Sequence, residues 1–144
     1  GSLAAGDALS ESQWHDSYGT RCNGLSYRRS MVRAEDITDG ASMTLMLGER
    51  YLNPDVMLTG GDASDDQCLY SGHDRDVVRD ASQTPMRDTR GQSNQHNFGS
   101  AHAGSWFGVM GDGAVRSFSY TMDHVNVLRR LANRYDGQVV DDRR

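Results

Sequence analysis

The sequence predicts an α+β fold with an antiparallel sheet, long irregular loops, and a C-terminal β-hairpin that is followed by a helix. The last third of the chain alternates apolar and polar residues around an Asp-Gly turn, a strong short-range signal for a hairpin. The composition holds 16 Gly, and aspartate exceeds glutamate, a bias typical of turns and caps rather than helices. Residues 53–100 show no apolar periodicity, which indicates loops.

Length and composition indicate one globular domain. The chain has 144 residues, of which 36% are hydrophobic, so it can bury a modest core. We expect a polar N-terminal segment over residues 1–23 and a single domain over residues 24–144; the initial Gly1-Ser2 is typical of a cloning scar. The longest apolar run, Gly40–Gly48, is far shorter than the roughly 20 residues that cross a bilayer. No signal peptide is readable.

The first regular elements are expected between residues 33 and 51. Arg33–Gly40 predicts a short helical turn that ends at a glycine in the left-handed region. Ala41–Leu47 predicts a buried strand. Its core-facing residues are expected at every second position, at Met43, Leu45 and Leu47. We expect this strand to continue to Tyr51 and to be broken at Asn53-Pro54.

The C-terminal third predicts a hairpin and a helix. Ser105–Met110 and Ala114–Tyr120 are the expected strands, joined by the tight turn Gly111–Gly113. Asp123 is a suitable N-cap for a helix that extends to about Asn133. Residues at helical spacing form its expected apolar face: Val125, Leu128 and Leu131.

Two neighbouring aromatic residues in the first hairpin strand are expected on opposite faces of the sheet. Successive side chains of a strand alternate between the faces, so one of Trp106 and Phe107 belongs to the core. The other is expected under the helix or under a partner subunit.

The region 53–100 needs an ordering device besides an apolar core. Asp62, Asp65 and Asp66 form an acidic cluster, with Asp74 and Asp76 nearby. Hard cations such as Ca²⁺ take oxygen ligands from aspartates and loop carbonyls, so this cluster is a candidate calcium site. The alternative is a set of solvated acidic turns, and the spacing does not match the EF-hand loop.

The two cysteines, Cys22 and Cys68, leave two readings open. In an oxidising compartment they are able to pair, and closing a loop of this length contributes roughly 3–4 kcal/mol. Otherwise they are two unrelated thiols. Their spacing matches no structural zinc pattern.

Charge argues against nucleic acid as a partner. The chain carries 20 acidic and 15 basic residues, a net charge of −5, and no basic stripe is visible. Phosphate backbones are bound by clustered cations, so no nucleic-acid interface is expected.

His102 and Asp112-Gly113 are separated by nine residues and form an H-x9-DG pattern. A metal or substrate contact across the hairpin mouth is one interpretation. The other is structural: His102 bonds a backbone carbonyl or Asp112 and locks the loop before the strand onto the turn. No nucleophile stands at a suitable spacing, so a catalytic triad is not supported.

This pattern, within Phe98–Ser105 and Gly111–Asp123 and together with Ile37–Glu49 upstream, resembles the planctomycete-type family of prepilin-like proteins with a C-terminal H-x9-DG domain of unknown function. The resemblance covers roughly residues 24–141. Family members typically begin with a prepilin peptidase site and a hydrophobic helix; this chain shows neither and resembles the soluble head without that helix. It also departs at Met110-Gly111, where a cysteine is common before the Asp-Gly.

The resemblance implies a pilin-like head that is exported to the cell envelope or the extracellular space. We therefore expect a non-catalytic, pseudopilin-like structural or assembly subunit of a secretion or surface complex, similar to those of type II secretion. Its partners would be other pilin-like subunits or envelope proteins, with membrane contact only through the missing helix. The alternative is an extracellular binding module for a glycan, a small solute or a calcium ion. Apart from possible Ca²⁺, no cofactor is implied.

Overall fold

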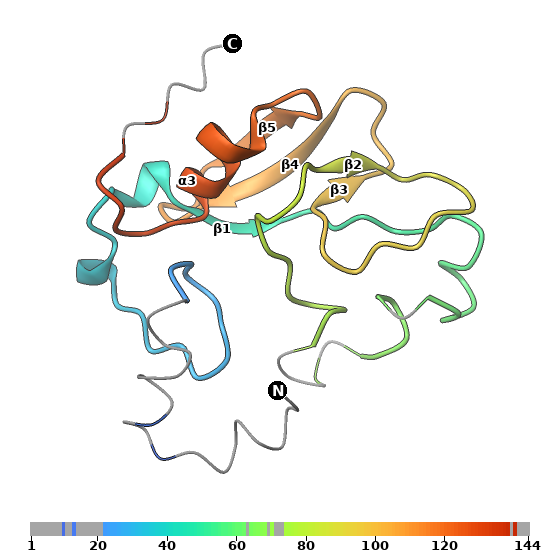
Figure 1. The fold of residues 1–144 in the computed structure, drawn as a ribbon, viewed down its shortest axis with the longest axis horizontal. Helices are drawn as coiled ribbons and strands as arrows, with labels where there is room; N and C mark the ends of the chain where they lie inside the picture. Colours follow the sequence, from blue (N-terminus) through green and yellow to red (C-terminus); the bar gives the residue numbers. More distant parts are fainter. Residues whose placement is uncertain are drawn as a thin grey trace.

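The computed structural model of the chain confirms the α+β architecture (Figure 1). The structure describes residues 10, 13, 22–62, 64–68, 70, 74–138 and 140. The expected polar segment 1–23 therefore lies mostly outside the described residues.

A three-stranded antiparallel sheet forms the centre of the fold. Its strands are β1 (Leu45–Gly48), β4 (Ser105–Met110) and β5 (Val115–Ser119), in the order β1-β4-β5. The hairpin is as predicted: β4 and β5 pair in register from Ser105 opposite Ser119 to Val109 opposite Val115. The tight turn between the two strands requires a positive φ. Gly113 supplies it with a φ of 86°, which a glycine reaches without steric cost.

A second, parallel pair extends the molecule beside this sheet. It consists of β2 (Met86–Arg87) and β3 (Gly99–Ser100). A Cβ atom at Gly99 would lie 2.1 Å from the carbonyl oxygen of Met86, so only glycine allows the two backbones to approach. An isolated bridge between Arg50 and Phe98 connects this pair to the chain that leaves β1.

Helices are short, as the aspartate-rich composition predicted. Two 3-10 turns, η2 (Ala34–Asp36) and η3 (Ala41–Met43), precede β1. After β5, the predicted helix is present as a π-helical turn, η5 (His124–Leu128), that continues into α3 (Arg129–Leu131). Asp123 caps it as expected, because its side chain accepts the N–H groups of Val125 and Asn126.

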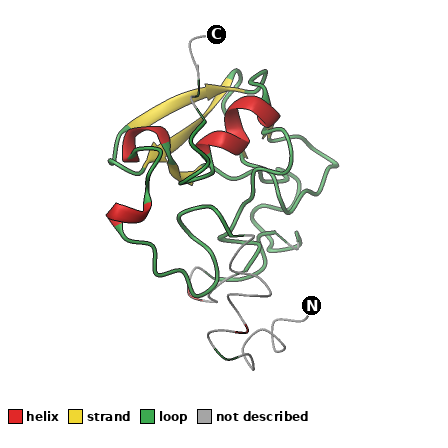
Figure 2. Ribbon diagram, turned by 60° about the vertical axis from the view of Figure 1, so that its left-hand side comes forward, coloured by secondary structure: helices red, strands yellow, loops and turns green. Residues whose placement is uncertain are grey.

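The core lies between the sheet and this helix (Figure 2). Trp106 is fully buried and stacks on Phe98 at a centroid distance of 5.2 Å. Its other neighbour is Phe118, at 4.9 Å. Leu128 and Leu131 cover the aromatic group from the helix and are fully buried, as predicted. Val125 was expected on the same face but is 47% exposed, because the wider π-turn rotates it away from the 3.6-residue period.

The burial pattern of β1 differs from the prediction. Its first half is the 3-10 turn η3 rather than strand, and the pairing register with β4 shifts between Leu45 and Leu47. Such a bulge exchanges the faces of the following residues. Leu45 is buried as expected, but Leu47 is exposed and Thr44 is buried, where its hydroxyl donates to the carbonyl of Gly40 at 3.1 Å.

The bulge gives the sheet an apolar outer face, opposite the helix. Leu47 pairs with Val109, and Val109 pairs with Val115, so one row of three aliphatic residues crosses all three strands. Phe107 lies on the same face as Val109, two positions along β4. Leu47, Phe107 and Val115 are 58%, 39% and 66% exposed. We call Leu47, Phe107, Val109 and Val115 the outer face.

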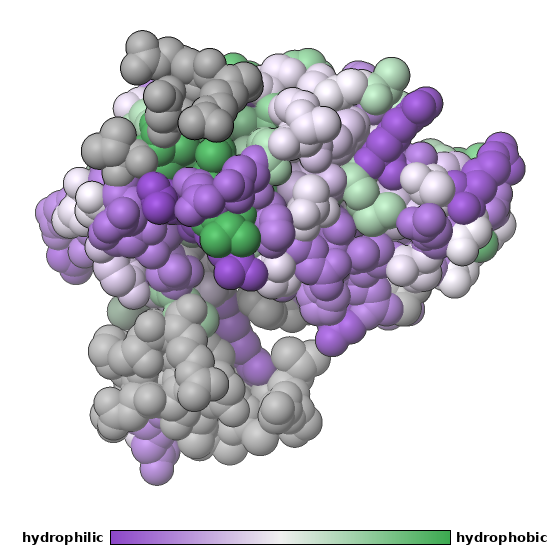
Figure 3. Space-filling view, turned by 45° about the horizontal axis from the view of Figure 1, so that its top comes forward, coloured by the Kyte–Doolittle hydropathy of each residue, from purple (hydrophilic) through white to green (hydrophobic). Residues whose placement is uncertain are grey.

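Figure 3 shows the distribution of hydropathy on one face of the molecule. On the face drawn in Figure 3 hydrophilic side chains predominate, and hydrophobic ones gather in a small area.

Candidate functional site

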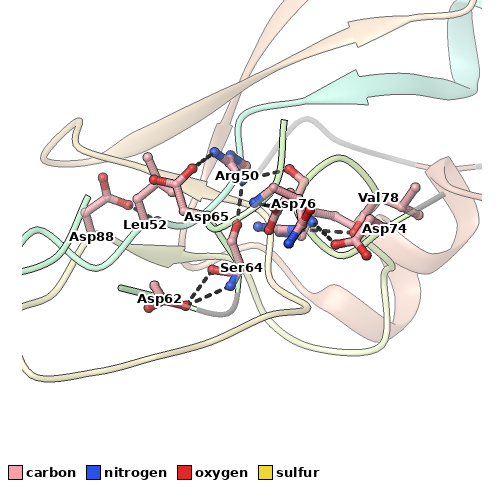
Figure 4. Close-up of polar contacts among 11 residues, drawn as sticks. Arg50, Leu52, Asp62, Ser64, Asp65, Asp74, Asp76, Val78 and Asp88 are labelled. Atoms are coloured by element: carbon pink, nitrogen blue, oxygen red, sulfur yellow. Dashed lines mark hydrogen bonds and ion pairs between the residues drawn. The ribbon is translucent and has the colours of Figure 1, made fainter. Parts of the chain in front are cut away.

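Arg50 organises the loops that follow β1. One nitrogen of its guanidinium, Nη1, donates to the carbonyls of Ser64 and Asp76 at 2.6 and 2.7 Å. The other, Nη2, forms an ion pair with the Asp65 carboxylate. Figure 4 shows these groups converging on Arg50 from separate loops. The side chain thus brings two carbonyls and one carboxylate to a single positive charge.

Asp62 and Asp76 are buried beside this arginine, each only 4% exposed. One oxygen of Asp62 accepts hydrogen bonds from the Ser64 N–H at 3.0 Å and from the hydroxyls of Ser64 and Ser93 at 2.9 and 3.0 Å. Burial alone would raise the pKa of Asp62, but these hydrogen bonds and the positive charge of Arg79 together lower it. Asp76 accepts the backbone N–H of Gln67.

Arg79 supplies the second positive charge. Its Nη1 donates to the Val78 carbonyl at 3.2 Å, whereas its buried Nε and Nη2 have no acceptor among the described residues. Burial and the neighbouring Arg50 lower the pKa of Arg79, against the opposing effect of Asp76, Asp62 and Asp65. The charges of these five residues nearly balance. We call Arg50, Asp62, Asp65, Asp76 and Arg79 the arginine–aspartate cluster.

The residues of the candidate calcium site make contacts within the protein. No three histidine, cysteine, aspartate or glutamate residues in the described ranges are placed to hold a metal ion. Asp65 is neutralised by Arg50, Asp62 is bonded by serines, and Asp66 is exposed. Asp74 accepts the N–H of Asp76 within its own turn. A guanidinium therefore pairs with one of the three candidate carboxylates, that of Asp65, and calcium binding stays a prediction.

The signature residues His102 and Asp112 lie at opposite ends of β4 and do not meet. A six-residue strand between them corresponds to about 20 Å. His102 Nε2 lies 3.5 Å from a Glu49 oxygen, and its ring meets Phe107 edge-on at a centroid distance of 5.3 Å. Asp112 accepts the N–H of Ala114 at 2.9 Å and closes the hairpin turn. His102 and Asp112 therefore do not bond each other, which was one of the two structural contacts expected for His102, and each residue makes its contacts locally.

The loop that carries His102 is held by Tyr120 instead. The Tyr120 hydroxyl donates to the carbonyls of Ser100 and His102 at 3.0 and 3.2 Å. Ser100 Oγ in turn accepts the N–H of His102 at 3.1 Å. The end of β5 thus fastens the loop before β4.

Cys22 and Cys68 do not form a disulfide in the structure. Burial raises the pKa of the Cys22 thiol, and the charge of Arg134 acts in the opposite direction. Arg134 also donates to the carbonyls of Cys22 and Gly24, both at 2.8 Å, so a guanidinium again holds an irregular segment.

A cavity of about 650 Å³ adjoins the cluster. One wall is β1, and the others are the segments 22–27 and 77–82. Its lining is mainly apolar, but it also includes three arginines, Arg50, Arg79 and Arg129, and one carboxylate, Asp80. Sequence reasoning missed Arg50 and Arg79. The available signal was the acidic excess of the loop, which needs positive partners if it is to be buried.

Within the described residues, no helix has the length and apolar character needed to cross a membrane. No curated protein matches the chain, and no solved structure matches it. Residues 3–124 match the family SBP_bac_10, described as "Protein of unknown function (DUF1559)". That match spans most of the 144 residues, and the chain therefore belongs to the DUF1559 family.

Proposed function

We propose that this chain is the head of a pseudopilin-like subunit that acts by assembly rather than by catalysis, in the cell envelope or outside the cell. The observation that carries the proposal is the outer face. Its apolar row is continuous across three strands, and contiguous exposed apolar surface marks interaction sites on soluble domains. Its partners would be other pilin-like subunits or envelope proteins.

The arrangement of the outer face suits packing against a neighbour. The row consists of three uncharged residues in paired strands, Leu47, Val109 and Val115. The signature residue His102 and its neighbour Glu49 flank the row at Phe107. A polar rim around an apolar centre is the usual anatomy of a protein interface.

Disulfide trapping between copies tests the proposal. In a background in which Cys22 and Cys68 are serine, we would introduce Val115→Cys in the outer face or Leu58→Cys in a loop. Leu58 is 92% exposed and Val115 66%, so random collision favours the loop cysteine. Preferential cross-linking of the Val115→Cys chain at moderate concentration supports the proposal. Equal or slower cross-linking than at Leu58→Cys would contradict it.

A second candidate function is a binding module, and the cavity beside β1 favours it. Its volume of about 650 Å³ lies within the usual range for ligand sites. Its lining is mainly apolar and carries three arginines against one aspartate, which favours an anionic ligand over a calcium ion.

A further inference from the structure

We propose that the cavity beside β1 binds an extended peptide that carries an acidic side chain, and that this peptide adds to the sheet as a fourth strand along β1. The proposed site lies at the edge of the sheet. It is therefore separate from the outer face, and either proposal can fail without the other.

The backbone of β1 presents a free edge to the cavity. β1 is an edge strand of its sheet, and β4 is the only described strand that pairs with it. Glu49 donates its N–H to the Phe107 carbonyl of β4 at 2.9 Å. Because donors alternate between the two edges of a strand, the N–H group of the preceding residue, Gly48, points away from β4. Met46 precedes it at the bulge. Both residues line the cavity.

An edge of this kind is a template for another strand. Unpaired N–H and C=O groups of an edge strand accept an extended peptide, whose alternate side chains then enter pockets. The cavity provides apolar walls for such side chains from three separate segments, including Leu25, Val78 and Phe98. Its volume of about 650 Å³ suits a few side chains rather than a folded domain.

The charge of the cavity wall selects an acidic peptide. Three arginines and one aspartate line it. Arg50 is already engaged by Ser64, Asp65 and Asp76. Arg79, in contrast, keeps two buried guanidinium nitrogens without an acceptor among the described residues. A carboxylate that reaches these nitrogens, once the guanidinium turns toward the cavity, would gain a charge-assisted hydrogen bond, roughly twice as strong as a neutral one.

Peptide binding to the 144-residue chain tests both parts of the proposal. The probe is the labelled peptide acetyl-Val-Glu-Val-Glu-Val-amide, and the charge control replaces both glutamates by lysines. Fluorescence anisotropy should show binding of the acidic peptide at least about tenfold tighter than that of the basic one. Equal affinity for both peptides, or no binding at millimolar concentration, would overturn the proposal.

Backbone pairing is tested on the unmodified protein. Two peptides are compared, one N-methylated at the odd residues and the other at the even residues. Because the N–H groups of alternate residues face the same neighbour, only one of these two phases of methylation removes the donors that face β1. We expect one phase to lose about tenfold or more in affinity and the other to bind nearly as before. If both phases bind equally, or if decanoate competes fully while methylation has no effect, the cavity takes a small amphipathic anion and strand addition is refuted.

The role of Arg79 is tested by Arg79→Gln, with Arg90→Gln as the charge-matched control in an exposed ion pair. The first change should reduce affinity for the acidic peptide about tenfold and leave the basic peptide unaffected, whereas the second should leave both unchanged. Equal effects of the two changes would show that only net charge matters. A thermal melt establishes that each variant is folded at the binding temperature.

Discussion

The two halves of this molecule are stabilised by different physics. The sheet and the C-terminal helix surround an apolar core in which Trp106 contacts Phe98 and Phe118. The loops after β1 are joined by Arg50, which bonds Ser64, Asp65 and Asp76. The first arrangement depends on buried area and the second on charge. Changes that act on only one of these terms therefore separate the two halves.

Arginine side chains hold together the irregular, acidic loops of the second half. Irregular backbone cannot satisfy its own carbonyls, so it needs donors from elsewhere. Arginine supplies several N–H groups and a permanent charge on one side chain. Arg50 serves the loops in this way, and Arg134 does the same for the segment at Cys22 and Gly24.

The largest effect is expected in the apolar half. Trp106→Ala should lower the free energy of unfolding by about 3–5 kcal/mol, because it leaves a cavity at the centre of the core. The matched control is the next residue, Phe107→Ala on the outer face, where the side chain is 39% exposed and the cost should stay below about 1.5 kcal/mol. Urea unfolding measures both, and similar costs would contradict the assigned faces.

The polar half should respond to loss of Arg50. Arg50→Ala leaves two carbonyls and the Asp65 carboxylate without their donor, and we expect a cost of about 3 kcal/mol. This is the lower end of the range for breaking a buried pair, because both partners are partly exposed. Arg90→Ala breaks the exposed pair with Asp55 and should cost less than about 1 kcal/mol in the same urea titration. Equal costs would remove the distinction between the two ion pairs.

The signature turn should give a smaller effect. Gly113→Ala forces an alanine to a φ of 86° and should cost about 1–2 kcal/mol. Gly104→Ala is the control, because an added Cβ meets nothing within 4 Å at either position and only Gly113 has a positive φ. Thermal melts of both variants measure the difference, and equal melting temperatures would show that the turn relaxes at no cost.

Acid should weaken the polar half selectively, through Asp62. Its folded pKa is lowered, so its contribution to stability is present above the unfolded value near 3.9 and is lost as the pH falls through the folded pKa. The pKa of Asp88 is raised by burial and by Glu49, although the Leu52 N–H opposes this. Asp88 has the opposite effect on the free energy of unfolding. Its contribution to the stability of the protein is present at low pH and is lost as the pH rises through its folded pKa.

We expect the stability of the parent chain to fall below about pH 4, and Asp62→Asn to flatten this dependence. Trp106→Ala should shift the whole curve without changing its slope. Urea midpoints measured between pH 3 and 6 provide the test. An unchanged slope in Asp62→Asn would show that other carboxylates control the acid response.

Local sequence signals predicted the apolar half well. The alternation over Ser105–Met110, the Asp-Gly turn and the capping residue Asp123 each act within a few residues, and the structure confirms them. The errors in predicted burial arose where one extra residue shifts the repeat of buried and exposed positions along a strand or helix. The bulge at Leu45–Leu47 and the π-turn that exposes Val125 depend on tertiary packing, which periodicity does not record.

The polar half was beyond local reasoning for a different reason. Arg50 contacts residues that lie 14, 15 and 26 positions later, and no spacing rule connects them. The acidic cluster was visible in the sequence, but the identity of its positively charged partner was not. Asp62, Asp65 and Asp66 suggested a cation, and the structure pairs Asp65 with an arginine. His102 and Asp112 likewise share a sequence pattern without sharing a site.

Site-resolved hydrogen exchange on Arg50→Ala tests most directly whether a guanidinium holds the loops together. We predict that the amides of Asp65, Gln67 and Val78, which are hydrogen-bonded in and beside the cluster, lose protection at low denaturant. The Met110 amide in the hairpin, bonded to Ala114 at 2.8 Å, should keep its protection relative to global unfolding. Unchanged protection in the loops, or an equal loss at both places, would contradict the account.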